Sequence, residues 1–360
     1  MSVPLHLSIV VPSRNSVSTL RSVLAAIRAT ELPQDNYELI VVDDASSDAS
    51  PTVAARYADT IIRLTGRPLG PAYARNRGAE LARGEIVAFV NPDVLVEPNT
   101  LPAMLAIFAE NSGIGAVSAS HDDTPAANFV SQYWNLLLRF GEQRHSGVVG
   151  DLASGCSAMR RSVLMSAGMY DEWRFGTGCL EGLELGQRLH NGAHGVLVSR
   201  NIQVMHLKQW SARSVCREVW SRSRMLARSL GYQNTRAAVP SEVVITLTRA
   251  MPPALAAVSI VALSGAFLPE PSWQAKATIA IVGIFVANLP VYRYYAAARG
   301  LDFAICAVPL HLVAQSLAAI ALCAGWVLRN TVGDRSPDAA TQAYAEVGLE
   351  KWPPVPRRRQ

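Results

Sequence analysis

Up to about residue 120, the chain alternates short apolar runs with amphipathic stretches. Short apolar runs bounded by turn-forming residues are typical of buried strands, whereas apolar residues spaced three and four apart are typical of helices. A regular alternation of strand and helix predicts a mostly parallel sheet covered by helices. We expect strands at 7–12, 38–43, 60–64, 86–90 and 114–119, and helices at about 17–29, 49–57, 71–82 and 98–110.

The next region, roughly 125–235, has a less regular pattern. Within it, the segment Phe129–Phe140 carries apolar and aromatic residues at helical spacing, including Tyr133 and Trp134. An amphipathic helix of this kind can pack on the sheet or lie on a membrane. We favour packing in the core.

Three apolar blocks follow Val243, at Ala250–Leu268, Ala277–Tyr292 and Phe303–Leu328. A helix that spans a membrane needs about 20 mostly apolar residues. The first and third blocks meet this length, and the second does so only if residues 294–298 extend it. The pattern therefore predicts two or three membrane segments.

These patterns divide the chain into three parts. We expect a catalytic domain over residues 1–235, a helical membrane domain over 236–329, and a disordered polar tail over 330–360. The first seven residues lead directly into the first strand, so we expect no cleaved signal peptide and a cytoplasmic catalytic domain in a multi-pass protein of the cell membrane.

The net charge of +5 matters less than where the charge lies. Arginines concentrate just before the first apolar block, which is typical of cytoplasmic segments beside a membrane and suits anionic lipid headgroups. No recognised nucleic-acid motif accompanies them, so we expect a membrane partner and no nucleic acid. These arginines are Arg213, Arg217, Arg222, Arg224, Arg228, Arg236 and Arg249.

The chain has five cysteines, an odd number, and they are scattered without the spacing of metal ligands. This argues against a disulfide framework and against a zinc site. We expect them to be buried, small apolar residues.

Polar side chains follow three of the expected strands at the point where each strand ends. In a parallel sheet the carboxyl ends of the strands open onto one crevice, so these groups can gather around one ligand. Adjacent carboxylates can accept hydrogen bonds from a base N–H and a ribose hydroxyl, which distinguishes a nucleotide from a bare phosphate. The pattern predicts a nucleotide-sugar site. The residues are Asn15, Asp43, Asp44 and Asp93.

Asp93 closes the strand 86–90 in the sequence Asn91-Pro92-Asp93. A carboxylate there suits a hard divalent cation shared with a diphosphate, and the alternative is a residue that caps a loop. Its place at the same sheet edge as Asp44 favours the metal, which we expect to be Mg²⁺ or Mn²⁺.

A glycine-bounded segment from Gly70 to Gly78 carries Arg75 and Asn76 on an expected helix. Guanidinium and amide donors can hold a phosphate or sugar oxygen, although arginines on helices are also often simply solvated.

Taken in order, these motifs resemble those of the inverting, GT-A-fold nucleotide-sugar glycosyltransferases of family 2. The later segment 155–172 resembles the family's "Gly … Arg-Arg … Gly-Gly-Phe-Asp-Glu" stretch, and 181–189 resembles its "Glu-Asp-x-Glu-Leu-x-x-Arg" acceptor motif. The resemblance covers about 8–210. The earlier motifs are 8–15, 42–48, 70–78 and the Asn91-Pro-Asp93 variant of Asp-x-Asp.

The resemblance implies a GT-A domain with a Rossmann-like, mostly parallel sheet. It places Pro12, Arg14 and Asp44 near the base and Arg75 near the donor diphosphate. It also places Asp93 on the divalent metal. His206 matches a position that can face the diphosphate or the metal, and a structural histidine is the alternative. The full set of candidate donor-binding residues is Pro12, Arg14, Asn15, Asp43, Asp44, Gly70, Arg75, Asn76, Asn91 and Asp93.

The sequence departs from the family pattern at two positions. Asn91 replaces the first aspartate of Asp-x-Asp, and Gly182 stands where the family has its catalytic base. An attacking hydroxyl must lose its proton, so a carboxylate within hydrogen-bond reach is wanted. The candidates are Glu181 and, second, Glu184, which can instead pair with Arg188 four residues later.

No Gln-x-x-Arg-Trp sequence occurs, and in the resembling family that motif marks processive polymer synthases. We therefore expect a membrane-bound glycosyltransferase that moves one sugar, with inversion, to a lipid, glycolipid or other membrane-associated acceptor. Two alternatives stay open: a polyprenyl-phosphate glycosyl synthase, and a catalytically impaired scaffold subunit that binds a nucleotide sugar.

Overall fold

The structure is a computed structural model that describes residues 6–124, 126–144, 146–148, 152, 155–172, 180–229, 271–332 and 349–352. The chain forms two compact units. The first, here called the sheet domain, comprises residues 1–124, 145–208 and 335–360, and the second, the helical domain, comprises 125–144 and 209–334. The boundary differs from the expected one near 235, because residues 125–144 and 209–229 belong with the helical domain.

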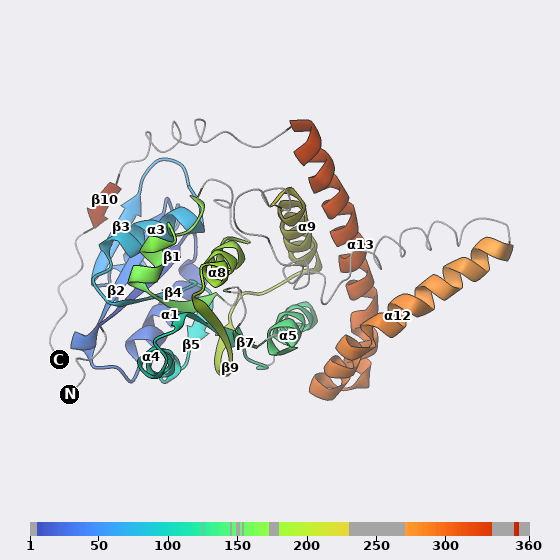
Figure 1. Cartoon of the computed structure of the whole chain (residues 1–360), viewed down its shortest axis with the longest axis horizontal. Coiled ribbons are helices and arrows are strands. Elements are labelled where there is room, and N and C mark those ends of the chain that lie inside the picture. The colour runs from blue at the N-terminus through green and yellow to red at the C-terminus, as the bar shows by residue number, and fades with distance from the viewer. Residues whose placement is uncertain are drawn as a thin grey trace. The chain divides into compact units, whose positions relative to one another are not determined.

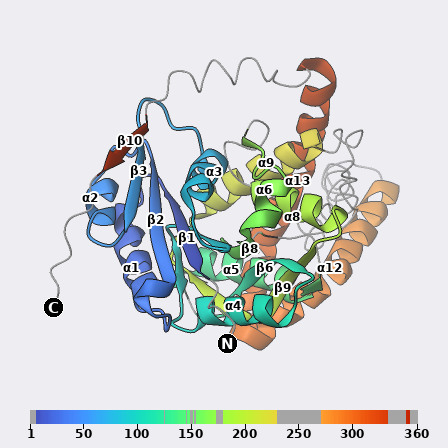
Figure 2. The ribbon, with the colours of Figure 1, turned by 60° about the vertical axis from the view of Figure 1, so that its left-hand side comes forward.

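The sheet domain is built on one mixed sheet of ten strands. The strands are β1 (Leu7–Ser13), β2 (Tyr37–Asp44), β3 (Thr60–Leu64), β4 (Ile86–Val90), β5 (Val94–Val96), β6 (Ile114–His121), β7 (Gly147–Val148), β8 (Cys156–Arg160), β9 (Gly195–His206) and β10 (Leu349–Trp352). Their order is β10-β3-β2-β1-β4-β8-β6-β9-β5, and β7 also pairs with β9 (Figures 1 and 2). β1 to β4, β6 and β9 run in one direction, so the sheet is mostly parallel.

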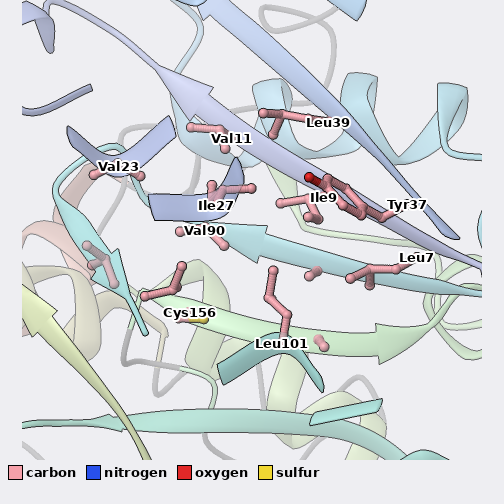
Figure 3. Packing of buried hydrophobic residues seen from close by; sticks show 14 of the residues in the cluster. Leu7, Ile9, Val11, Val23, Ile27, Tyr37, Leu39, Val90, Leu101 and Cys156 are labelled. Atoms are coloured by element: carbon pink, nitrogen blue, oxygen red, sulfur yellow. The ribbon is translucent and has the colours of Figure 1, made fainter. Parts of the chain in front are cut away.

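Helices cover both faces of this sheet, as the continuous burial of β1 and β2 requires. Alternate residues of β1 enter different cores, with Ile9 in one and Val10 in the other. The first core, drawn in Figure 3, contains Ile9 of β1 together with Val23 and Leu101 from two helices. The helices on that face are α1 (Val17–Arg28), α2 (Ser50–Ala54) and α4 (Thr100–Glu110), and those on the other are α3 (Pro71–Leu81), α6 (Arg161–Ser166) and α8 (Glu181–Asn191), with a short 3₁₀ turn η1 (Gln34–Asn36) before β2.

The expected strand and helix alternation up to residue 120 is confirmed, with shifts of a few residues at the element ends. The pattern missed β5, β7, β8, β9 and β10. β8 is antiparallel to both β4 and β6, so the sheet reverses direction there, next to β4, which ends at Val90 just before Asn91. The expected fold class, an α/β domain with a mostly parallel sheet followed by C-terminal helices, is confirmed.

The helical domain contains α5 (Phe129–Arg144), α9 (Ala212–Ser229), α12 (Pro271–Arg299) and α13 (Leu301–Val332). Its core joins Tyr133 and Trp134 of α5 with Val215 of α9 and Tyr295 of α12. The interpretation of Phe129–Phe140 as a helix that packs in a core is therefore correct, but the core is that of the helical domain.

Membrane segments receive partial support. Among the described residues one helix, Leu301–Thr331, is long and apolar enough to cross a membrane. The second expected block lies within α12, and the first, Ala250–Leu268, lies outside the described residues.

Two other predictions, a disordered tail and buried cysteines, differ from the structure. The tail expected to be disordered contributes β10, whose residues Leu349–Trp352 pair antiparallel with β3. Of the cysteines, Cys156 is buried as expected, whereas Cys306 and Cys323 are exposed on α13, so burial was wrong for these two. Cys179 lies outside the described residues.

Candidate functional site

The ends of β1 and β2 meet at one edge of the sheet. Ser13 pairs with Asp43 in the parallel register, so the two side chains emerge on the same face. Beyond the strands, the Asn15 side-chain oxygen accepts a hydrogen bond from the Ser47 backbone N–H at 2.8 Å. The Asn15 backbone N–H donates to the Ser46 hydroxyl. The loops that follow β1 and β2 are thereby tied together around this edge.

Asp44 uses both carboxylate oxygens to hold the segment that leads into α3. The backbone N–H groups of Leu69 and Gly70 each donate to Asp44 at 2.8 Å. Gly70 adopts φ of +99°, a conformation that glycine reaches without strain, and α3 begins at the next residue. The Asp44 side chain thus organises the loop, and its expected role near the base stays a prediction.

Asp43 uses only one of its two carboxylate oxygens as a hydrogen-bond acceptor within the described residues. Its Oδ2 accepts from the Ser46 N–H at 3.2 Å, while its buried Oδ1 accepts no hydrogen bond within the described part of the chain. Burial raises the pKa of the Asp43 carboxyl, and the hydrogen bonds of Ser46 and the charge of Arg63 oppose this shift only partly. An unpaired buried oxygen is costly unless a ligand donor meets it, so Asp43 suits an N–H of a nucleobase.

Arg75, on α3, lies at the centre of a buried polar cluster. Its Nη1 donates to Glu181 Oε1 at 2.7 Å, and its Nη2 donates to Asn91 Oδ1 at 2.8 Å. Arg75 is 8% exposed and Glu181 7% exposed. Burial lowers the pKa of Arg75, but the charge and hydrogen bond of Glu181, together with the charges of Tyr170 and Asp93, outweigh it and the net shift is upward. The arginine is therefore held as a cation beside the ends of β4 and α8.

Asn91 is positioned by a close approach of the chain at Gly155. The Asn91 N–H donates to the Gly155 carbonyl at 2.8 Å. A Cβ on Gly155 would lie 2.8 Å from the Asn91 side-chain nitrogen, and Gly155 has φ of +78°. Both observations require glycine at this position. The replacement of aspartate by Asn91 leaves a neutral acceptor for Arg75.

The two predicted metal ligands lie together, although they are far apart in the sequence. His206 Nε2 is 3.5 Å from Asp93 Oδ2, because β5 pairs with the end of β9 and the Leu207 N–H donates to the Asp93 carbonyl. Burial tends to raise the pKa of Asp93, but the hydrogen bond and charge of His206 and the charge of Lys208 hold it below its ordinary value.

One carboxylate and one imidazole fit a divalent cation that also takes diphosphate oxygens and water. Among the described residues, no group of three or more His, Cys, Asp or Glu side chains is arranged around a metal site. A cation held here would therefore depend on the donor diphosphate for its remaining ligands.

Two predicted site residues have their polar atoms engaged elsewhere. The Asn76 amide donates to the Tyr170 carbonyl and to Glu172, and its oxygen accepts the Tyr170 N–H. Asn76 thus fixes the 170–172 segment and offers no donor to a substrate in this structure. Glu184 pairs with Arg188 at 2.6 Å, which is the alternative given for it above.

Close packing against Leu152 explains why glycine stands at position 182. A Cβ built at this position would lie 2.6 Å from the Leu152 carbonyl oxygen, closer than real Cβ atoms approach. An aspartate cannot occupy position 182 without a shift of the Leu152 backbone. Glu181 is therefore the carboxylate that the start of α8 presents to Arg75.

Pro12 and Arg14 flank the end of β1. Pro12 is buried in register with Val42, and Arg14 is exposed. Three residues were missed. Tyr170 places its ring 5.3 Å below the Arg75 guanidinium, Glu172 binds Asn76, and His121 lies 5.6 Å from the His206 ring. His121 ends β6, so the rule applied to the other strand ends could have found it.

Comparison with known proteins agrees with this geometry. Residues 8–168 match the family model described as Glycosyl transferase family 2. These residues, a little under half of the chain, are similar to a glycosyltransferase domain of that family, and the expected enzyme class, a glycosyltransferase, is confirmed.

Curated relatives cover parts of the chain. EpsH of Bacillus subtilis is 37% identical over 103 residues, which is 27% of this chain and 29% of EpsH. Beta-monoglucosyldiacylglycerol synthase of Trichormus variabilis is 27% identical over 198 residues, 51% of this chain and 41% of that synthase. The matches span less than half the length of either relative.

Among solved structures, the mannosyltransferase PcManGT of Pyrobaculum calidifontis has a TM-score of 0.58 at 17% identity, covering 91% of this chain and 88% of that one. It was solved with GDP-Man and Mn²⁺. The similarity confirms the fold of the present chain.

Proposed function

We propose that this chain transfers a single sugar from a nucleotide-diphosphate sugar, with inversion, to a lipid-linked or membrane-associated acceptor. The observation that carries the proposal is the cluster between the end of β4 and the start of α8, where Arg75 donates hydrogen bonds to both Asn91 and Glu181. The same strand end leads to Asp93, whose charge also acts on Arg75. A cation, a carboxylate and a candidate metal pair thus lie around one point.

The donor is bound in three parts. Asp43 Oδ1 offers a buried acceptor to a base N–H, and Asp44 shapes the Gly70 loop against which the nucleotide lies. Arg75 provides charge-assisted hydrogen bonds for the diphosphate. Asp93 and His206 would hold Mg²⁺ or Mn²⁺, which neutralises charge on the departing diphosphate.

The acceptor hydroxyl attacks the anomeric carbon from the side opposite the diphosphate. The new bond from oxygen to carbon forms as the bond to the diphosphate oxygen breaks, and the hydroxyl proton passes to the Glu181 carboxylate. In the present structure that carboxylate is paired with Arg75. A donor diphosphate competes for Arg75, so donor binding weakens this pair and makes Glu181 available as the base.

A second candidate follows from the same pair. Because Glu181 is held by Arg75 and position 182 is closed to an aspartate, the site offers little help to an acceptor that must lose a proton. A polyprenyl phosphate is already ionised and needs no base. Glu181→Gln separates the two: it stops transfer to a hydroxyl and leaves transfer to a phosphate within a few-fold of wild type.

The proposal is tested by release of nucleoside diphosphate from full-length protein in detergent. The panel contains UDP-, GDP- and dTDP-sugars with Mn²⁺ or Mg²⁺, with and without membrane lipid extract. Release from one donor, increased by lipid, is expected. Donor binding without release under any condition would contradict the proposal and favour a scaffold subunit that binds the nucleotide sugar.

A further inference from the structure

α9 of the helical domain presents a line of arginines on one side. On a helix with 100° per residue, positions 213, 217 and 224 project within about 40° of one another. Arg213, Arg217 and Arg224 are exposed, and within the described part of the chain none of them forms an ion pair. We call these three side chains the arginine face of α9.

Other described side chains of α9 are buried or form an ion pair. Val215, Val219 and Leu226 lie away from the arginine face and are buried in the helical domain. Arg222 lies on the side opposite the arginine face and donates to Glu218 at 2.7 Å, so its charge is matched. Among the side chains of α9 that the structure describes, the unmatched positive charge is therefore concentrated on one line.

This face lies in an apolar setting. α9 packs directly on α13: a Cβ added at Gly325 would lie 2.8 Å from the Cβ of Ala227, and it would also meet the Arg224 carbonyl (Figure 1). Trp326, the next residue of α13, is 61% exposed. An exposed tryptophan beside an arginine is typical of the headgroup level of a membrane.

Large apolar side chains are also exposed on α12 and α13. Surfaces of this kind suit the acyl region below the headgroups. They are Val282, Phe285, Val286 and Leu289 on α12, and Leu301, Ile305, Val313, Ile320, Trp326 and Val327 on α13.

We propose that the arginine face of α9 docks the helical domain on the phosphates of anionic lipid headgroups, with α9 lying along the membrane surface. This rests on the membrane-associated part of the proposed function and not on its chemistry. Guanidinium groups bind phosphate oxygens in pairs, and a line of exposed arginines matches a plane of anionic headgroups.

The spacing of the arginines sets the orientation. Arg213 and Arg224 are eleven residues apart, which is about 16 Å along a helix. Were α9 perpendicular to the bilayer, one of these arginines would lie about halfway through the hydrocarbon core of about 30 Å. All three reach headgroups together when the helix axis lies in the membrane plane.

The test is flotation of full-length protein, diluted from neutral detergent, with vesicles of phosphatidylcholine alone or mixed equally with phosphatidylglycerol. We expect at least tenfold stronger binding to the anionic vesicles, reduced at about 1 M salt, where screening acts within about 3 Å. Replacing Arg213, Arg217 and Arg224 by Gln should lower anionic binding about 100-fold, roughly fivefold per arginine. Replacing them by Lys should retain most of it.

Controls separate this face from net charge. Arg21, Arg56 and Arg200 are exposed on the sheet domain, and their triple Gln variant carries the same charge change. Arg222→Gln on α9 should have a smaller effect than Arg217→Gln. Equal binding to both vesicles, or equal losses in the two triple variants, would overturn the proposal.

Competition decides the nature of the partner. Inorganic phosphate and a short RNA should not displace the protein from anionic vesicles, and displacement by the RNA at matched phosphate concentration would overturn the proposal in favour of a nucleic acid. Release of nucleoside diphosphate in detergent should be unchanged in the triple α9 variant. Absent release together with anionic selectivity would refute the transferase and leave the docking face standing.

Discussion

The substitution Glu181→Gln tests the buried cluster at the centre of the site. It keeps the size of the side chain but removes the charge that faces Arg75, a cation that is 8% exposed. Removing one partner of a buried ion pair typically costs about 3–5 kcal/mol. Because glutamine retains an oxygen for Arg75 Nη1, we expect the lower end, about 3 kcal/mol. For a domain of roughly 150–250 residues this lowers Tm by about 6–12 °C.

The assay is thermal denaturation of the full chain followed by circular dichroism. Glu184→Gln is the matched control, since it makes the same change on the same helix. Its partner Arg188 lies at i+4 and the pair is partly exposed, so a loss of only about 0.5 kcal/mol is expected. Arg75→Met and the double variant complete a thermodynamic cycle, in which the double variant should lose at least 1 kcal/mol less than the sum of the single losses.

Coupling between Arg75 and Glu181 is refuted if Glu181→Gln and Glu184→Gln are equally stable, or if the cycle is additive. Either result would show that the 2.7 Å contact between Arg75 and Glu181 contributes no coupling. For transfer to a hydroxyl acceptor, the same variant should also lower turnover by about 10²–10⁴, the usual contribution of a general base.

Three further predictions concern Gly182 and Asn76 near the site, and Glu38 at the start of β2, where it binds Ser8 and Arg83. Gly182→Asp, which restores the family residue, should reduce both Tm and turnover, because its Cβ meets the Leu152 carbonyl and such overpacking costs about 1–3 kcal/mol; higher turnover than wild type would refute this. Burial tends to raise the pKa of Glu38, but hydrogen bonds and the charge of its neighbours hold it below the ordinary value, so its contribution to stability is present above pH 4.5 and lost as pH falls through the lower folded pKa. Glu38→Gln should therefore be destabilised by about 1–3 kcal/mol at pH 7, and its difference from wild type should shrink as pH falls below 4.5; a gap in Tm that does not change with pH would contradict the shift. Asn76→Ala should lower Tm, because it leaves the Tyr170 backbone unpaired inside the protein, and it should change the KM for donor less than Arg75→Lys does; the reverse order in KM would return Asn76 to the donor site.

The first half of the fold was predictable because its signals are local. β1 and β2 are buried on both faces, so each reads as a continuous apolar run that ends at a polar residue. The helix α1 buries Leu20, Val23, Leu24 and Ile27 at the spacing of one helical face.

The missed strands depend on partners far away in the sequence. β5 has three residues and exists because it pairs with the end of β9. β8 inserts antiparallel between β4 and β6, and nothing in its own residues specifies that direction. The same holds for α5. Its buried aromatic face predicted a helix, but it did not predict which domain the helix would join.

The candidate site divides in the same way. The positions of Asp43, Asp44, Arg75 and Asp93 followed from strand ends and spacing. The roles within the site did not, because they depend on which oxygen each donor reaches: Asp44 binds a loop, and Asp43 retains the unpaired oxygen. Such assignments require coordinates.

The most direct test of the account is the Mn²⁺ dependence of nucleoside diphosphate release, compared between wild type and Asp93→Asn. The substitution keeps the shape of the side chain and removes the charge that lies 3.5 Å from His206 Nε2. The account predicts release from one nucleotide sugar that is lost on chelation, restored by Mn²⁺ in wild type, and at least 100-fold lower in Asp93→Asn at every metal concentration. Equal release by the two proteins, or release that is unaffected by chelation, would contradict the assignment of this site as a metal-dependent glycosyltransferase centre.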